Sequence, residues 1–229
     1  MSHEPISMFH HDQPPESREG PLLFYVTDRH GFAAAVSRQS ALLLESIARA
    51  SAAGVDAIQI REKDLSGRAL FELTQAALAR ASHSKILVND RLDVALAAGA
   101  AGVHLGEESV AVADVVGVRA AGRAPAGFLI GRSCHSLQAA LDAERAGAGY
   151  IFFGPVFATP SKAKFGPPQG AEALAAVCRA VHIPVVAIGG ITLENAASCV
   201  AAGAAGIAAI RLFQESEDLQ AVVRALKKV

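Results

Sequence analysis

A short segment after an apolar stretch near position 150 carries two hydroxyls and an ammonium group within four residues. Thr159, Ser161 and Lys162 surround Pro160. Because proline fixes its own φ, the two hydroxyls are held at little entropic cost, while lysine adds a mobile point charge. These donors suit a phosphate or pyrophosphate, although an ordinary polar surface turn has the same composition. The segment predicts an anion-binding loop.

A second group of polar side chains alternates along an apolar run. Gln59, Arg61 and Lys63 stand at every second position, so they share one face of a strand. Two cations on an interior face are strongly unfavourable without an anion. An anionic ligand is the simplest partner. The alternative is that the cations pair with neighbouring carboxylates of this chain, namely Glu45, Glu62 or Asp64.

The next two apolar runs also end in polar residues. Asn89 can hydrogen-bond a polar heteroaromatic edge, and Asp90 offers a hard oxygen ligand for Mg²⁺ or, alternatively, the N-cap of the following helix. Glu107 and Glu108 bring further carboxylates to the same region. His104, inside the preceding run, is expected to be a hydrogen-bonded core residue rather than a catalyst.

Ser133 and His135 follow a fifth apolar run, with Ser136 as a candidate N-cap for the next helix. His135 could move protons near neutral pH, or it could be held structurally at the junction.

The last two apolar runs end in Gly189-Gly190 and in Ile210-Arg211. A Gly-Gly step before a helix lets backbone amides approach a phosphate closely, although a tight turn without a ligand has the same sequence.

The elements that must position these residues alternate between short apolar runs and Ala-rich segments of helical period. The predicted strands are 23–27, 57–61, 86–89, 102–105, 128–131, 150–153, 184–188 and 206–210. The predicted helices are 41–53, 67–81, 92–98, 111–119, 137–146, 171–180, 193–201 and 219–228. Continuous apolar strands are typical of a parallel sheet covered by helices.

Ala-Gly repeats at 52–56, 98–103, 146–150 and 202–207 stand where a helix ends and a strand begins. Glycine there supplies a left-handed C-cap. The eight predicted strands, each followed by a predicted helix, indicate an α/β fold with a single TIM (β/α)8 barrel at 21–229. The active site of such a barrel lies at the carboxyl ends of the strands. A doubly wound sheet is the alternative, but no glycine fingerprint follows the first strand.

Composition narrows the class of ligand. The 229 residues are 52% hydrophobic with a net charge of −1, so no basic field favours nucleic acid. Three cysteines without a Cys-x-x-Cys spacing fit a reducing cytoplasm rather than a disulfide framework or zinc site. Residues 1–20 are rich in His, Pro, Glu and Ser, lack an apolar run for a signal peptide or membrane span, and are expected to form a short disordered, flexible tail.

In their order, these segments resemble the thiamine-phosphate synthases and their TenI relatives, from about Phe24 to about Phe213. The motifs that carry the resemblance are Gln59-x-Arg61-x-Lys63, Asn89-Asp90-Arg91-x-Asp93-x-Ala95, Gly102-Val103-His104-Leu105-Gly106, Ser133-x-His135-Ser136, Gly154-Pro155-Val156-Phe157-x-Thr159-Pro160-Ser161-Lys162, Pro167-Pro168-Gln169-Gly170 and Ala187-Ile188-Gly189-Gly190-Ile191.

The resemblance implies a transferase that joins the diphosphate of 4-amino-2-methyl-5-hydroxymethylpyrimidine to a thiazole phosphate, giving thiamine phosphate and pyrophosphate. The implied ligands of the pyrimidine diphosphate are Gln59, Arg61, Lys63, Asn89, Ser133 and Lys162. The implied ligands of the thiazole phosphate are Thr159, Ser161, Gly189, Gly190 and the step from Ile210 to Arg211. The implied catalytic residues are Arg61, Lys63 and Lys162, with His135 as the acid-base candidate. Mg²⁺ is the implied cofactor, held by Asp90.

The chain departs from the family pattern at three places. Ser109 replaces a second magnesium-binding aspartate, for which Glu107 or Glu108 is the candidate substitute, and Arg211 stands where serine is common. The stretch around His135 is closer to TenI, a thiazole tautomerase in which the matching histidine moves protons. A tautomerase and a non-catalytic binder of thiamine-pathway phosphates therefore remain alternatives. We favour the synthase because its diphosphate-binding set is complete, and we leave a homodimer open.

Overall fold

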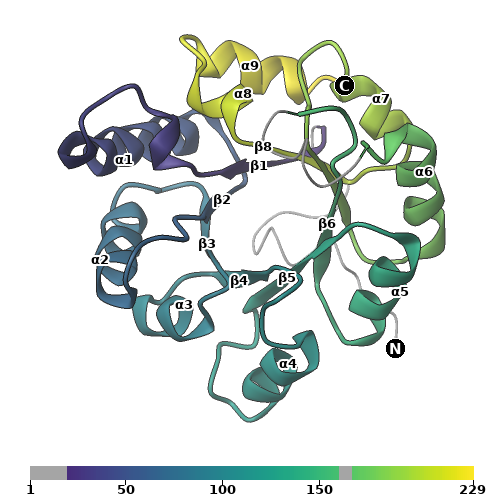
Figure 1. The fold of residues 1–229 in the computed structure, drawn as a ribbon, viewed down its shortest axis with the longest axis horizontal. Coiled ribbons are helices and arrows are strands. Elements are labelled where there is room, and N and C mark those ends of the chain that lie inside the picture. The colour runs from purple at the N-terminus through teal and green to yellow at the C-terminus, as the bar shows by residue number, and fades with distance from the viewer. Residues whose placement is uncertain (1–19, 160–166) are drawn as a thin grey trace.

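A closed barrel of eight parallel strands forms the centre of the molecule (Figure 1). The computed structural model describes residues 20–159 and 167–229. The strands follow one another round the barrel in sequence order, and β8 pairs with β1. They are β1 (Leu22–Val26), β2 (Ala57–Ile60), β3 (Lys85–Asn89), β4 (Gly102–Leu105), β5 (Leu129–Cys134), β6 (Tyr150–Phe153), β7 (Val185–Ile188) and β8 (Gly206–Ala209). The predicted TIM barrel is confirmed, while the tail predicted at 1–20 lies, except for Gly20, outside the described residues.

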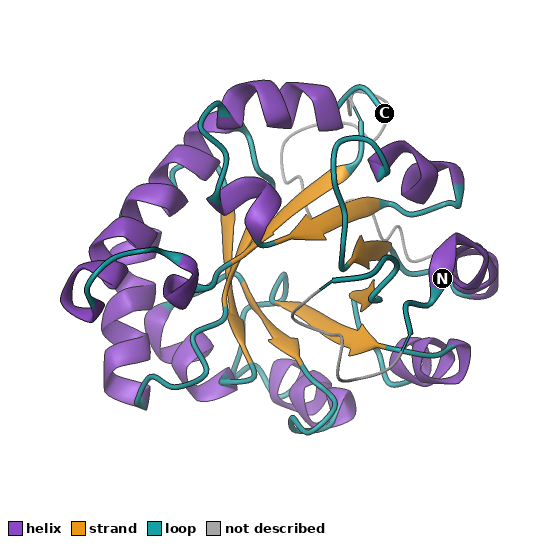
Figure 2. Cartoon of the chain, turned by 45° about the horizontal axis from the view of Figure 1, so that its top comes forward, coloured by secondary structure: helices purple, strands orange, loops and turns teal. Residues whose placement is uncertain are grey.

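The helices form a ring outside the strands (Figure 2). They are the short 3-10 helix η3 (Arg29–Gly31), α1 (Val36–Ala53), α2 (Gly67–Leu78), α3 (Leu92–Ala98), α4 (Val112–Ala120), α5 (Leu137–Arg145), α6 (Gly170–Ala180), α7 (Ala196–Ala201), α8 (Arg211–Gln214) and α9 (Leu219–Leu226). None of the helices in the described part of the chain is long and apolar enough to cross a membrane.

The glycines of the Ala-Gly repeats end helices as predicted. Gly54 and Gly99 are left-handed C-caps with φ of 95° and 73°. Gly147 and Gly203 follow the C-caps of α5 and α7 with φ of 92° and 97°. These glycines turn the chain from each helix back into the barrel, because most side chains disfavour positive φ.

Strand alternation divides the apolar residues into two layers. On β1, Leu22, Phe24 and Val26 join the cluster inside the barrel, whereas Leu23 and Tyr25 join the cluster between sheet and helices. The inner cluster is completed by Ala57, Leu87, Leu129, Tyr150, Phe152, Val186 and Ala208. The barrel is therefore filled with side chains rather than hollow.

Several boundaries differ from those predicted. β5 continues to Cys134, because Ser133 and Cys134 still pair with β6. α1 begins at Val36 rather than at position 41, and α7 begins at Ala196 rather than at 193. The sequence did not predict η3 and α8, which are too short to show a helical period.

Candidate active site

The inward positions change from apolar to polar toward the carboxyl ends of the strands. On β2 and β3, Ala57 and Leu87 belong to the inner apolar cluster, and Gln59 and Asn89 follow two residues later on the same face. Ser133 takes the equivalent inward place on β5. The structure thus brings these three predicted ligands to one mouth of the barrel.

A chain of amide hydrogen bonds fixes how Gln59 faces this mouth. Asn89 Nδ2 donates to Asp90 Oδ2 at 2.5 Å, and Gln59 Nε2 donates to Asn89 Oδ1 at 2.7 Å. An ionised carboxylate only accepts, so Asn89 must turn its NH₂ to Asp90 and its oxygen to Gln59. Gln59 Oε1 is then left as a buried acceptor without a partner within the described residues. A buried carbonyl oxygen needs a hydrogen-bond donor, and a ligand group or a water molecule could supply it.

Asp90 lies at the centre of the polar side of the mouth. Its Oδ1 accepts from the Gly106 N–H at 2.9 Å and from the Ser109 hydroxyl, and its Oδ2 lies 3.9 Å from Lys63 Nζ. Burial alone raises the pKa of Asp90, but these donors and the lysine charge hold it below its ordinary value. The proposed helix-capping role of Asp90 is wrong, because Arg91 is the N-cap of α3 and no side chain caps that end.

His104 is a buried core histidine, as predicted. It is 1% exposed, with Nδ1 3.0 Å from Tyr150 Oη and Nε2 2.9 Å from Ser133 Oγ. Burial lowers the pKa of His104 to about 3, so the ring is neutral near pH 7. A neutral imidazole between two hydroxyls holds Ser133 in place at the mouth.

Arg61 and Lys63 stand beyond the end of β2 and are not neutralised by their sequence neighbours. Glu62 and Asp64 pair with Arg29 instead, so the alternative internal pairing predicted for the two cations is wrong. Within residues 20–159 and 167–229, Lys63 pairs with Asp90 alone, and no carboxylate forms an ion pair with Arg61. Both Arg61 and Lys63 are therefore available to an anion.

His135 has defined contacts at the rim. Its Nδ1 is hydrogen-bonded to the Gly154 carbonyl oxygen, so Nδ1 carries the proton in the neutral ring. Nε2 lies 4.0 Å from Glu107 Oε1. Ser136 caps α5, as predicted, by accepting from the Ala139 N–H at 3.1 Å. His135 thus has one ring nitrogen fixed by the backbone and the other beside a carboxylate.

The opposite side of the mouth is built mainly of backbone. Val156 N–H donates to the Ile188 carbonyl at 2.9 Å, Phe157 N–H to the Gly189 carbonyl at 3.0 Å, and Asn195 Nδ2 to the Gly190 carbonyl at 2.9 Å. Because C=O and N–H point in opposite directions in a trans peptide, the next three N–H groups point away from these partners. This geometry suits the predicted phosphate site.

Gly189 and Gly190 are required by this close packing. Their φ values are 97° and 66°, and a Cβ on Gly190 would lie 2.5 Å from the Ala158 carbonyl oxygen. The predicted tight turn is present at this step, and the predicted approach of a phosphate to it stays a prediction.

The remaining predicted thiazole-phosphate ligands are only partly placed. Thr159 is half-buried at the end of the described segment, whereas Ser161 and Lys162 lie outside the described residues. Ile210 packs against the inner cluster as the N-cap residue of α8, and Arg211 is exposed in the first position of that helix.

The described residues fit a magnesium ion held by few protein ligands. They contain no cluster of three or more His, Cys, Asp or Glu side chains able to hold a metal by themselves. Asp90 offers one carboxylate beside the Ser109 hydroxyl. Within the described residues, the side chain of Glu107 lies beside His135 instead. Mg²⁺ is commonly held by one or two carboxylates together with substrate phosphates, so this donor set fits the ion as a partner of a bound diphosphate.

Two groups of supporting residues were not assigned by sequence reasoning. Thr27, Arg29 and Glu62 interact at the ends of β1 and β2, and Tyr150 supports His104 from β6. The sequence marked these residues only as charged or hydroxyl side chains at strand ends. It could not show their contacts, because in a barrel the partners lie about 30 to 50 residues apart in the chain.

The fold and the mouth together define a TIM-barrel protein with a cluster of polar and charged side chains at the carboxyl ends of its strands. The sequence model of the thiamine monophosphate synthase family matches residues 23–213. The chain belongs to this family.

Known proteins agree with that assignment. A thiamine-phosphate synthase of Roseiflexus castenholzii is 42% identical over 207 residues, which cover 90% of this chain and 86% of the relative. One of Chlorobium luteolum is 38% identical over 215 residues, covering 93% and 94%. The solved structure of a thiamine phosphate pyrophosphorylase from Pyrococcus furiosus superposes with a TM-score of 0.75 at 34% identity, covering 92% of this chain and 96% of that one.

Proposed function

We propose that this chain is a thiamine-phosphate synthase, a transferase that condenses 4-amino-2-methyl-5-hydroxymethylpyrimidine diphosphate with thiazole phosphate. The bond between the pyrimidine methylene carbon and the diphosphate oxygen breaks, pyrophosphate leaves, and the thiazole nitrogen forms the new bond to that carbon. The convergence of Gln59, Arg61, Lys63, Asn89, Asp90 and Ser133 on one mouth supports this function in a member of the family.

Gln59 is suited to the aminopyrimidine ring. Its unpartnered Oε1 is an acceptor, and an exocyclic amino group is a donor. An oxo group at the same ring position would place two acceptors together and leave both unpaired, which costs about 1–3 kcal/mol. Gln59 would therefore favour an amino- over an oxopyrimidine.

Arg61, Lys63 and Ser133 are suited to the diphosphate. The two cations would stabilise negative charge as it develops on the leaving pyrophosphate, and Ser133 would donate a hydroxyl hydrogen bond. Asp90, with Ser109 beside it, would hold Mg²⁺, which when bound supplies further positive charge to phosphate oxygens. Glu107 as a second ligand, and Ser161 and Lys162 as phosphate ligands, remain predictions.

The backbone side of the mouth would hold the thiazole phosphate. The N–H groups after Ile188, Gly189 and Gly190 point away from the β6 loop, and backbone N–H groups at such loops commonly bind phosphate. Thr159, Ile210 and Arg211 would contribute at its edges. Cytoplasmic location and a homodimer stay predictions from the sequence.

His135 supports a second candidate function, thiazole tautomerisation. Its Nδ1 proton is fixed on the Gly154 carbonyl, so Nε2 is the nitrogen that could take and return a proton. The Glu107 carboxylate lies 4.0 Å from Nε2, on the side from which a substrate proton would come or go. This function needs neither the two cations that follow β2 nor Mg²⁺.

The experiment is to incubate the purified protein with the pyrimidine diphosphate, thiazole phosphate and Mg²⁺, and to measure thiamine phosphate and pyrophosphate. We expect both products in equal amounts, and neither when thiazole phosphate is left out. Absence of thiamine phosphate, together with a tautomerase activity that His135→Ala abolishes, would replace the synthase with the second function. Binding of thiamine phosphate without either reaction would favour a non-catalytic binder.

A further inference from the structure

Four residues of alternating charge follow β2. Arg61, Glu62, Lys63 and Asp64 are consecutive, so each cation that faces the mouth has a carboxylate next to it in the chain. Carboxylates so close in sequence compete with a ligand for the same cations. The proposed anion-binding role of Arg61 and Lys63 thus depends on which groups pair with the carboxylates of Glu62 and Asp64.

Arg29, the first residue of η3, pairs with both carboxylates. Its Nη1 lies 3.0 Å from Glu62 Oε2 and 2.6 Å from Asp64 Oδ1, and its Nη2 is paired with Asp64 Oδ2. Arg29 and Glu62 are buried, at 7% and 1% side-chain exposure. The hydrogen bonds from Arg29 hold the pKa of Asp64 well below its usual range. One guanidinium fork therefore satisfies two acids, which a single ammonium group could not do.

Further donors complete the environment of Glu62. The backbone N–H of Arg29 donates to Oε1 at 3.2 Å and to Oε2 at 3.1 Å, and the Thr27 hydroxyl donates to Oε1 at 2.6 Å. Thr27 Oγ1 in turn accepts from the Arg61 N–H at 2.9 Å. Because all of the groups around its carboxylate are donors, Glu62 is held on the β1 side of the strand end.

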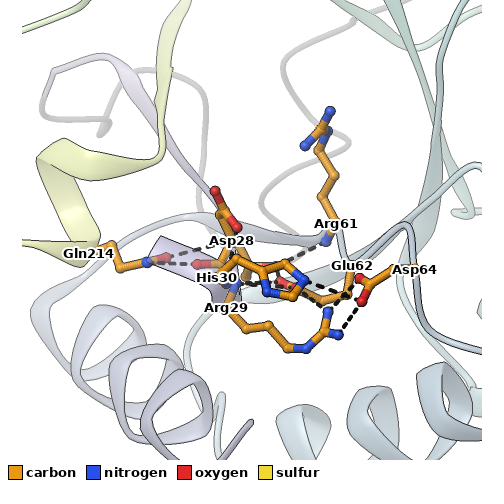
Figure 3. Close-up of polar contacts among 8 residues, drawn as sticks. Asp28, Arg29, His30, Arg61, Glu62, Asp64 and Gln214 are labelled. Carbon is orange, nitrogen blue, oxygen red and sulfur yellow. Dashed lines mark hydrogen bonds and ion pairs between the residues drawn. The ribbon is translucent and has the colours of Figure 1, made fainter. Parts of the chain in front are cut away.

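The side chain of Arg61 leaves this cluster. Figure 3 shows its guanidinium directed away from Arg29, Glu62 and Asp64, while its backbone nitrogen remains bonded to the cluster. Lys63 approaches Asp90 on the mouth side. The cluster thus separates the two acids from the two cations that alternate with them.

We propose that Arg29 is a positioning residue that neutralises Glu62 and Asp64, and so keeps Arg61 and Lys63 available to the diphosphate. The inference rests on the proposed function, because it assumes that these two cations bind the diphosphate. Arg29 itself does not need to touch the ligand. Removing its charge would release two acids toward Arg61 and Lys63.

Binding of inorganic pyrophosphate in the presence of MgCl₂, measured by calorimetry, tests the proposal without the thiazole substrate. The variants are Arg29→Met, Glu62→Gln and Arg29→Met/Glu62→Gln. The control is Arg145→Met, which removes an exposed arginine paired with Asp142 at the last turn of α5. Thermal unfolding of each variant is recorded alongside.

We expect Arg29→Met to weaken pyrophosphate binding about tenfold, the scale of one charge-assisted hydrogen bond that a competing acid takes from the ligand. The double variant should recover to within about threefold of the parent protein, because one of the two competing acids is then neutral. Glu62→Gln should bind as well as the parent or more tightly, and Arg145→Met should not change. A purely structural role predicts instead that the double variant stays as weak as Arg29→Met.

Unchanged affinity of Arg29→Met, or a double variant without recovery, would overturn the proposal. If Arg29→Met does not fold, Arg29→Lys replaces it: we expect affinity to fall about threefold and Asp64→Asn to restore it, since one ammonium group cannot hold both acids. Unchanged affinity of Arg29→Lys would then overturn the proposal. A parent protein that does not bind pyrophosphate would also overturn it, whereas one that binds pyrophosphate but makes no thiamine phosphate would contradict only the proposed function.

Discussion

The two sides of the barrel mouth are built from different materials. On the side of β2 to β5, side chains converge: Gln59, Asn89 and Asp90 form one hydrogen-bonded row, with Lys63 beside it. On the side of β6 and β7, backbone groups meet backbone groups, and Gly190 is needed because no side chain fits. In the proposed function, the first side would select a ligand by charge and hydrogen-bond polarity, and the second by how closely a small anion can approach the chain.

The largest expected effect removes a charge from the side-chain half. Arg61→Ala should lower synthase turnover about 10²- to 10³-fold, as loss of one preorganised electrostatic group commonly does. Steady-state rates at saturating thiazole phosphate and Mg²⁺ measure it. Arg145→Ala serves as the control, since this exposed arginine pairs with Asp142 on α5. A decrease smaller than about threefold would mean that the proposed charge selection does not operate there, since a preorganised group should contribute far more.

The next effect adds a side chain to the backbone half. Gly190→Ala should lower the free energy of unfolding by about 3 kcal/mol, because the new Cβ meets the Ala158 carbonyl at 2.5 Å in addition to the positive-φ cost. Gly122→Ala is the matched control: its φ is +71° and nothing lies within 4 Å of the added Cβ. It should cost only about 1–2 kcal/mol. Equal decreases in urea unfolding would show that close packing does not constrain Gly190.

The smallest effect concerns the layer under the side-chain half. The pKa of His104 is lowered from 6.5 to about 3 by burial, so the unfolded chain binds a proton below pH 6.5 that the folded chain does not. Stability should therefore fall as the pH drops from about 6.5, by up to about 1.4 kcal/mol per pH unit. Urea unfolding of the parent and of His104→Gln between pH 7 and 5 compares the two. Parallel pH profiles would indicate that folding does not lower the pKa of His104.

Sequence patterns predicted the barrel and the shared face of Gln59, Arg61 and Lys63 because the signals for both are local properties of the backbone. Apolar runs alternate with helical segments, glycines such as Gly54 and Gly99 end helices, and residues two apart share a strand face. Alternation predicted that Gln59 shares a strand face with Arg61 and Lys63, and Asn89 was predicted at the mouth from its place at the end of an apolar run. The end of β5 was predicted too early because Ser133 is polar, whereas pairing with β6 continues through it.

Which acid meets which cation was decided only by the closed barrel. In the sequence, Glu62 and Asp64 are nearest to Arg61 and Lys63, yet Arg29 takes both acids across 33 and 35 positions. His104 likewise reaches Ser133 and Tyr150 across 29 and 46 positions. Side-chain direction repeats every two residues along one strand, so sequence can determine it. Coulomb energy and hydrogen bonding depend on distances between strands, and these are fixed only when the barrel closes.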